Sequence, residues 1–298
     1  MEFPIFLIQL LNSVQYGLLL FLVASGLTLL LGIMGIINVA HGSFYMIGAY
    51  LAWSLAEQLG SLWIAIPAGV LLTVAIAMVL EWLVIRKLYR RDHLYQVLLT
   101  YGLILVFEDM RSVIWGDDVH GVNIPGILAG SLPLTDNLSY PVYRLFISGV
   151  CLAVALAMYW IIQRTRLGMV VRAGYSNREM VQSLGINIEF IYRVVFAFGV
   201  ALAALAGMIA APVSSVFPGM GSQVLIICFV VVVIGGMGSV KGALLASLLI
   251  GFADTFGKVL HLEIGGIRLL PELSSMTVYL LMAIVLLWRP EGFFGKRV

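Results

Sequence analysis

Charged residues are scarce in this chain of 298 residues, where Asp, Glu, Lys and Arg together make up only 11 %. A soluble globular domain typically carries about 25 %. Hydrophobic residues make up 62 %, and the mean hydropathy is +1.07. The few polar groups cannot cover so much apolar volume, so most side chains must face lipid or one another. The composition argues against a water-soluble enzyme and indicates an integral membrane protein.

Cysteine, long basic runs and catalytic motifs are also missing. The two cysteines, Cys151 and Cys228, lie alone in apolar segments, which argues against a disulfide framework or a Cys/His metal site. The formal net charge is only +2, so nucleic acid is not expected as a partner. The sequence has no H-E-x-x-H helix, no G-x-S-x-G elbow and no phosphate-binding loop. We therefore expect no cofactor in this chain, and any ATP or Mg that drives it must be bound by another subunit.

Apolar runs long enough to cross a membrane divide the sequence, because a spanning helix needs roughly 20 apolar residues. Two shorter runs are interrupted by glycine and could be short spans, broken helices or re-entrant segments. We predict an all-α, polytopic transmembrane helix bundle of about 8–9 membrane segments in a single domain, 1–298. The expected long spans are about 8–34, 62–85, 94–114, 142–163, 191–211, 243–260 and 272–288, and the short segments are about 43–56 and 224–238.

The basic residues predict an orientation, because loops rich in Lys and Arg stay in the cytoplasm. Most of the 17 basic residues fall in the connections near 86–91, 164–193 and 241 and at the C-terminal end. With nine crossings, these connections all lie inside, the N-terminus lies outside and the C-terminus inside. The start of the chain has no basic region, so we expect no cleavable signal peptide. The longest polar stretches are then an outer loop, about 115–141, and an inner loop, about 164–190.

The inner loop carries the signals of a short helix. Ser176 and Glu179 fit a capping box, and Gly185 fits a helix stop. Between them, Met180, Val181 and Leu184 recur at helical spacing and predict an apolar face on a helix over 177–184. Two interpretations stay open at this point. The helix lies on the inner lipid surface, anchored by Arg172 and Arg178, or its apolar face docks in a groove of a soluble partner.

Two polar, glycine-rich interruptions echo each other in the two halves of the chain, at Asn38–Tyr50 and Gly235–Ala243. Paired broken segments of this kind are typical of transport pathways, where irregular backbone lines a cavity. On that interpretation Gly48, Gly235, Gly236 and Gly238 lie on the pathway. The alternative is that the glycines only let helices approach closely. His41, at the edge of the first interruption, is expected to be a helix-boundary histidine with a hydrogen-bond partner.

Ionisable residues inside apolar segments are costly and are therefore functional candidates. Glu108 with Arg111, and Asp254 with Lys258, are spaced to neutralise each other on one helix face. Asp109 has no such obvious partner, and we expect it to face the interior of the bundle. These acids also keep two other classes open, an ion-coupled secondary transporter and a passive solute channel.

Short motifs spread over nearly the whole chain carry a family resemblance. They are Gly26-Leu27-Thr28, Ile36 to Gly42, Tyr45 to Tyr50, Leu99 to Leu103, Trp115-Gly116, Leu167-Gly168, Arg172-Ala173, Leu184 to Asn187, Gly235 to Ala243 and Arg289 to Gly295. In this order they resemble the LivH-type membrane permease subunits of ABC importers for branched-chain amino acids.

The resemblance implies a set of partners in a bacterial inner membrane. They are a second related permease subunit, two cytoplasmic ABC ATPases, a periplasmic substrate-binding protein and the membrane lipids. The chain would form half of a pathway for branched-chain or related amino acids or small organic solutes. Asn38, His41, Gly42 and Tyr45 would lie near the pathway. The inner loop would couple to an ATPase through Arg166, Gly168, Arg172, Ala173, Asn177, Glu179, Met180, Leu184 and Gly185.

Overall fold

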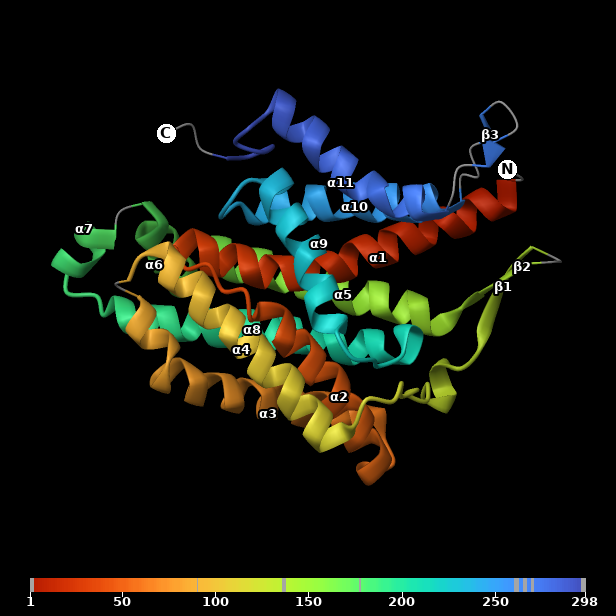
Figure 1. Cartoon of the computed structure of the whole chain (residues 1–298), viewed down its shortest axis with the longest axis horizontal. Coiled ribbons are helices and arrows are strands. Elements are labelled where there is room, and N and C mark those ends of the chain that lie inside the picture. The colour runs from red at the N-terminus through yellow and green to blue at the C-terminus, as the bar shows by residue number, and fades with distance from the viewer. Residues whose placement is uncertain are drawn as a thin grey trace.

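The computed structural model describes residues 3–89, 91–135, 138–176, 178–259, 263–264, 267–268 and 271–295. Most of its long helices run along the longest axis of the molecule, between two ends (Figure 1). The long helices are α1 (Phe3–Leu29), α2 (His41–Leu59), α3 (Leu62–Leu83), α4 (His93–Trp115), α5 (Val142–Arg164), α8 (Ile188–Ser214), α9 (Met220–Gly235), α10 (Val240–Val259) and α11 (Pro271–Trp288). Shorter elements are α6 (Arg166–Ser176), α7 (Arg178–Ser183), a π-helical turn η1 (Leu30–Met34) and the 3-10 turns η2 (Ile85–Leu88) and η3 (Gly126–Leu128).

Each apolar run predicted from the sequence overlaps one of the long helices, which confirms a helical bundle over the described residues. Among the described residues, five segments are long and apolar enough to cross a membrane: Pro4–Met34, Leu62–Leu83, Val142–Arg164, Ile188–Ser214 and Val240–Val259. The two glycine-interrupted runs form the helices α2 and α9. The exact number of crossings stays a prediction.

Two small antiparallel hairpins lie in segments that the sequence marked only as loops. Strands β1 (Ser131–Thr135) and β2 (Leu138–Pro141) pair in the outer loop, with Ser131 opposite Pro141. Strands β3 (Glu263–Ile264) and β4 (Ile267–Arg268) pair between α10 and α11. Strands this short leave no period-2 pattern long enough to recognise in a sequence.

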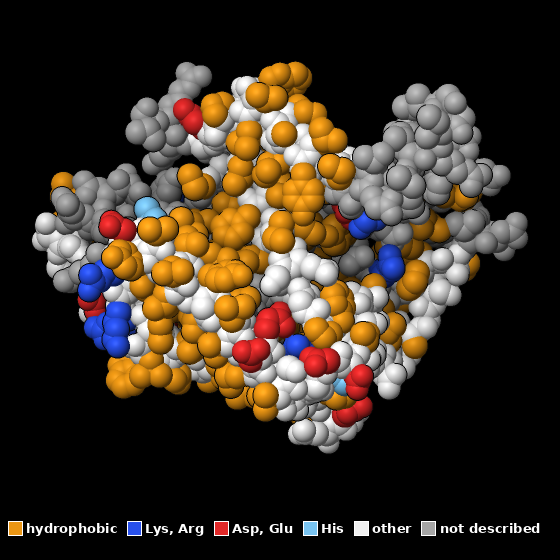
Figure 2. Space-filling model, viewed as in Figure 1, with side chains coloured by type: hydrophobic (Ala, Val, Ile, Leu, Met, Phe, Trp, Pro, Cys, Tyr) orange, Lys and Arg blue, Asp and Glu red, His pale blue; other side chains and the backbone are white. Residues whose placement is uncertain are grey.

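The core is built around α1, α2 and α8. In the apolar windows of Pro4–Met34 and α8, 89 % and 72 % of residues are buried, against 17 % in α5 and 28 % in α3. In α2 every residue from His41 to Ala52 is buried, on all sides of the helix. A helix that is buried all round is surrounded by protein, whereas α3 and α5 expose large apolar side chains at the periphery. Figure 2 shows hydrophobic side chains over most of the middle of one face of the molecule.

The connections sort into the same two groups that the basic residues predicted. One end of the molecule carries the N-terminal end of α1 and both hairpins, and the other carries α6 and α7 (Figure 1). At the α6–α7 end, Arg86 of η2 forms an ion pair with Glu189 of α8 at 2.6 Å. At the same end, the backbone N–H of Phe293 donates to the Ile234 carbonyl at the end of α9. Which end faces the cytoplasm stays a prediction.

Candidate functional site

The glycines of the first half of α2 lie at backbone contacts with two other helices. A Cβ atom on Gly42 would overlap the carbonyl oxygen of Gly221 in α9, and one on Gly48 would overlap the backbone of Ala204 in α8. On the α8 side of the same interface, a Cβ atom on Gly207 would overlap the Tyr45 carbonyl oxygen of α2. Small residues allow helix axes to approach this closely. In this conformation close packing therefore accounts for Gly42 and Gly48, and their place on a pathway stays a prediction.

The non-helical segment before α2 is fastened to α4 by side chains. The N–H groups of Ile37 and Val39 donate to Gln96 Oε1 at 3.1 Å and to Thr100 Oγ1 at 3.2 Å. Gln96 Nε2 in turn donates to the carbonyl oxygens of Leu88 and Arg91. Irregular backbone inside a bundle must have its polar groups satisfied in this way, because no water or lipid group replaces them.

Two polar residues, Asn38 before α2 and His41 at its first position, are buried, and the side chain of each forms a hydrogen bond with the backbone. Asn38 Oδ1 accepts the Ala40 N–H at 3.1 Å, and His41 Nε2 lies 3.1 Å from the Val23 carbonyl oxygen of α1. A carbonyl oxygen only accepts, so Nε2 carries the hydrogen. The expectation of a helix-boundary histidine with a partner is confirmed. Asn38 Nδ2 and His41 Nδ1 are buried with no partner among the described residues.

The second glycine-rich segment forms a tight turn between α9 and α10. Gly236 and Gly238 have positive φ angles of 92° and 81°, which side chains with a Cβ atom rarely adopt. A Cβ atom on Gly235 would lie 2.6 Å from the Gly242 backbone, and one on Gly32 of η1 would lie 2.6 Å from Gly238 Cα. The turn connects α9 to α10 and packs against η1. Here too, close packing accounts for the glycines in this conformation.

Asp109 does not face the interior of the bundle, so that prediction was wrong. The side chain is exposed, because the buried face of α4 is formed by Thr100, Ile104, Phe107 and Arg111. Arg111 was expected to pair with Glu108 and does so at 3.3 Å, and it also pairs with Asp117 at 2.9 Å. The hydrogen bond from Arg111 lowers the pKa of Asp117 below its usual range. A role of Asp109 on the pathway stays a prediction.

A polar cavity of about 450 Å³ opens between five helices, at the end that carries the N-terminus. Tyr45, from the predicted pathway set, lines it. The charged residues on its wall are Arg144 of α5 with Asp254 and Lys258 of α10, and the latter two pair at 2.6 Å as expected. Sequence reasoning missed Arg144, Asn12 and Gln15. The polar residues Asn12 and Gln15 inside the first apolar run were the available signal.

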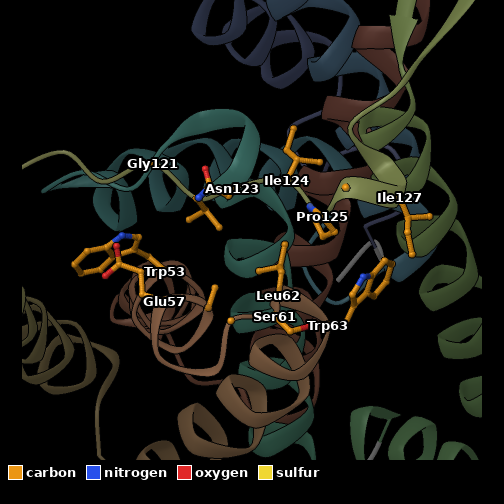
Figure 3. Close-up of a pocket in the computed structure, with 14 residues that line it drawn as sticks. Trp53, Glu57, Ser61, Leu62, Trp63, Gly121, Asn123, Ile124, Pro125 and Ile127 are labelled. Carbon is orange, nitrogen blue, oxygen red and sulfur yellow. The ribbon is translucent and has the colours of Figure 1, made fainter.

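A second pocket of about 580 Å³ lies at the outer loop, and Figure 3 shows its wall. Trp53 and Glu57 come from α2, and Trp63 comes from the start of α3. The loop Gly121–Ile127 closes the opposite side (Figure 3). Next to this pocket, His120 stacks on Trp53 with ring centres 3.7 Å apart.

At the other end of the molecule α5 turns sharply into α6, a helix that the sequence analysis did not predict. A Cβ atom on Gly168 would overlap the Ile161 and Ile162 carbonyl oxygens, so the turn requires glycine. Thr165 Oγ1 accepts the Gly168 N–H at 3.1 Å, and the Arg172 guanidinium donates to the Ile162 carbonyl. Arg172 therefore caps the end of α5, and its contact with lipid stays a prediction. Arg166 and Ala173 are exposed.

The predicted helix over 177–184 is confirmed as α7, Arg178–Ser183. Its Val181 is 3 % exposed, whereas Met180 and Leu184 are 58 % and 71 % exposed. Gly185 has φ +78°, as expected of a helix stop. The Ile186 N–H then donates to the Val181 carbonyl, and Asn187 caps α8 by accepting the Phe190 N–H at 3.1 Å. Asn177 lies outside the described residues, and the side chains of Ser176 and Glu179 are not described, so the capping box stays a prediction.

Comparison with known proteins identifies the family. The model for "Branched-chain amino acid transport system / permease component" matches residues 9–286. This chain belongs to that family. The permease is 30 % identical to the branched-chain amino acid transport permease BraD of Pseudomonas aeruginosa, over 98 % of this chain and 96 % of that protein.

Two further relatives come from Escherichia coli. The permease protein LivH is 28 % identical, over 99 % of this chain and 97 % of its own length. The permease protein LivM is 26 % identical, over 90 % of this chain and 65 % of its own length. The permease is thus a multi-pass membrane protein of a transport system.

Proposed function

We propose that this permease forms half of the translocation pathway of an ABC importer for branched-chain or related amino acids. A second related permease subunit supplies the other half, two cytoplasmic ATPases bind ATP and Mg, and a periplasmic protein delivers the solute. The chain lies in a bacterial inner membrane with its N-terminus outside and its C-terminus inside. The observation that carries the coupling part is the short helix α7 with the residue after it, where the apolar side chains of Met180 and Leu184 project at one end of a transport permease.

The contacts of α7 and α8 suggest how an ATPase is coupled to the pathway. Val181 is buried and Ile186 closes the end of α7, so α7 and the capped start of α8 are one connected unit. Further along, α8 touches α2 at Ala204 and Gly207 with backbone against backbone. Close-packed interfaces are not continuously deformable, so a displacement of α7 moves α8 against α2 as discrete states. Coupling requires that ATP-bound ATPases bind one of these states more tightly.

At the outer end, the connection between two loops suggests where the loaded binding protein docks. The outer loop 115–141 and the loop 212–222 are expected to form this surface. The N–H and carbonyl groups of His120 and Val216 are hydrogen-bonded to each other, both at 2.8 Å, so the two loops are tied together. Two loops joined by hydrogen bonds present one surface to a partner. A displacement of this surface when the binding protein docks therefore also displaces the end of α8.

Capture of the ATPase from membranes tests the coupling proposal. The double variant Met180→Asp and Leu184→Asp places two charges on the exposed apolar side of α7 and should abolish co-purification of the ATPase. Val119→Asp is the matched control, because Val119 is 67 % exposed but lies in the outer loop. Both proteins should insert into the membrane and melt at the wild-type temperature. Normal capture of the ATPase by the double variant would contradict the assignment.

Reconstitution separates the importer from the two other transport classes. The chain alone in vesicles should show no uptake, with or without an ion gradient, because its energy comes from other subunits. Uptake that follows the ion gradient would point to a secondary transporter instead. Rapid, non-saturating flux would point to a channel. Family membership favours neither of these two alternatives.

A further inference from the structure

The polar cavity at the outer end runs along α1. Along α1 its wall runs from Gln9 to Leu19, which is about 15 Å at 1.5 Å per residue. Its volume of about 450 Å³ is within the range of small-molecule sites, roughly 300–1,000 Å³. Polar side chains at membrane depth are costly unless they face protein or a water-filled path. A cavity of this kind in a transport permease is therefore open to a polar solute.

Arg144 is the side chain on this wall that lacks an opposite charge. Its Nη1 donates to Asn12 Oδ1 at 2.7 Å, and the same oxygen accepts from the Tyr140 hydroxyl at 3.2 Å. The four ion pairs of the described residues do not include Arg144. A guanidinium group has five donors in a planar fork. Two neutral groups, the Asn12 amide and the Tyr140 hydroxyl, hold it in place and leave most of these donors for a ligand.

The remaining charges of the cavity complete an asymmetric pattern. Lys258 Nζ lies 2.6 Å from Asp254 Oδ2 and forms an ion pair with it. The Lys258 side chain is 59 % exposed, whereas that of Asp254 is only 13 % exposed. Asp254 Oδ1 takes part in no hydrogen bond among the described residues. The wall thus carries two cations and one anion, a formal excess of one positive charge. An apolar part of the same wall comes from Leu19, Ala210 and Val213.

We propose that this cavity is a solute-binding station of the permease that recognises an α-amino acid by its carboxylate. Arg144 receives the carboxylate, since a guanidinium fork matches two carboxylate oxygens. The free oxygen of Asp254 receives the ammonium group, and the apolar wall takes an aliphatic side chain. The inference rests on the proposed function and adds to it a recognition site in the membrane subunit, separate from that of the delivering protein.

Tyr45 connects this solute-binding station to the interface between α2 and α8. Its side chain lines the cavity, and its carbonyl oxygen is at the close contact with Gly207 of α8. A displacement of α8 against α2 therefore changes the cavity wall directly. The station is placed where the same step that resets α7 would release the solute.

The test uses the complete importer in proteoliposomes, with the uptake of L-leucine measured at saturating, loaded binding protein. Arg144→Gln should reduce the maximal uptake about tenfold or more, because a charge-assisted pair in a cavity is lost. Arg144→Lys should recover part of it. Asn12→Ala removes the amide that positions Arg144 but keeps the cation, so it should reduce uptake less than Arg144→Gln does. Assembly with the ATPase should be unchanged in all three.

A second measurement separates recognition from a merely structural role of Arg144. Calorimetric titration of the permease–ATPase complex without binding protein should show binding of L-leucine and 4-methylpentanoate, but not of L-leucinamide, which has no carboxylate. Arg144→Gln should abolish that preference while the melting temperature stays within a few degrees of wild type.

The outcomes separate this inference from the proposed function. Wild-type uptake by Arg144→Gln, or equal binding of leucine and leucinamide by the wild-type complex, would overturn the carboxylate station alone. A wild-type complex that recruits no ATPase or imports no amino acid would instead overturn the proposed function.

Discussion

At the scale of the residue, glycines in the same chain have opposite roles. Gly48 lies against the backbone of Ala204, where a Cβ atom would have no room. Gly102 of α4 and Gly149 of α5 have open space within 4 Å of the position of a Cβ atom. The sequence shows three glycines inside apolar helices and does not distinguish them. Only the neighbour across the interface decides which glycine is required.

We predict that Gly48→Ala destabilises the permease, whereas Gly102→Ala does not. Ala at position 48 must displace backbone atoms of α8, and overpacking of this kind costs about 1–3 kcal/mol. The same change at position 102 meets nothing and gains helix propensity. The melting temperatures of the two variants in detergent are the measurement. Equal melting temperatures would mean that α2 and α8 are not in contact as described.

At the scale of the element, the segment between η1 and α2 depends on α4 for its shape. The helical pattern of α4 predicted a span, but not that Gln96 and Thr100 would bond to the backbone of Ile37 and Val39. Such pairing joins residues about sixty positions apart, and no local pattern contains it.

The variant Gln96→Leu should loosen this segment. It removes the acceptor of the Ile37 N–H and the donor to the Leu88 and Arg91 carbonyl oxygens, and these backbone groups are buried or part-buried. An unsatisfied buried group costs about 1–3 kcal/mol. We expect a lower melting temperature and faster hydrogen exchange at residues 36–40. Gln58→Leu is the control, because Gln58 is exposed on α2, the helix that follows this segment. This substitution should leave the melting temperature and the hydrogen exchange unchanged.

The two inner helices show which elements a sequence can reveal. The boundaries of α7 were predicted because the stop at Gly185 and the spacing of Met180, Val181 and Leu184 are local signals. The sequence analysis does not predict the neighbouring α6, although Leu167, Val170, Val171 and Gly174 repeat at helical spacing. Its start depends on the turn at Gly168, whose need for glycine comes from contact with α5.

At the scale of the whole molecule, the sorting of connections to two ends supports one orientation in the membrane. Thiol labelling tests it, since Cys151 and Cys228 are fully buried and give little background. The two labelling sites are Ala173→Cys and Ile127→Cys. Ala173 is exposed on α6, and Ile127 is 86 % exposed in the outer loop.

A membrane-impermeant maleimide added to intact spheroplasts should label Ile127→Cys and leave Ala173→Cys unlabelled. Inverted vesicles should show the opposite pattern. Labelling of Ala173→Cys from outside would place α7 in the periplasm and end the coupling proposal. The wild-type chain, labelled in parallel, measures the reactivity of the two native cysteines.

The sequence by itself determined that this is a helical membrane protein, where its long helices lie and which loops share an end. Composition, apolar run length and the placement of Lys and Arg are sums over neighbouring residues, so no fold is needed to evaluate them. It also revealed α7, because caps and helical spacing are local.

The tertiary structure alone decided that α2 is buried on all sides from His41 to Ala52, that Asp109 faces outward and that Arg144 and Asp254 share one cavity. A helical pattern shows which residues share a face, but it does not show what that face meets. A cavity built from five helices exists only after the chain has folded, because its residues come from positions between Gln9 and Val259.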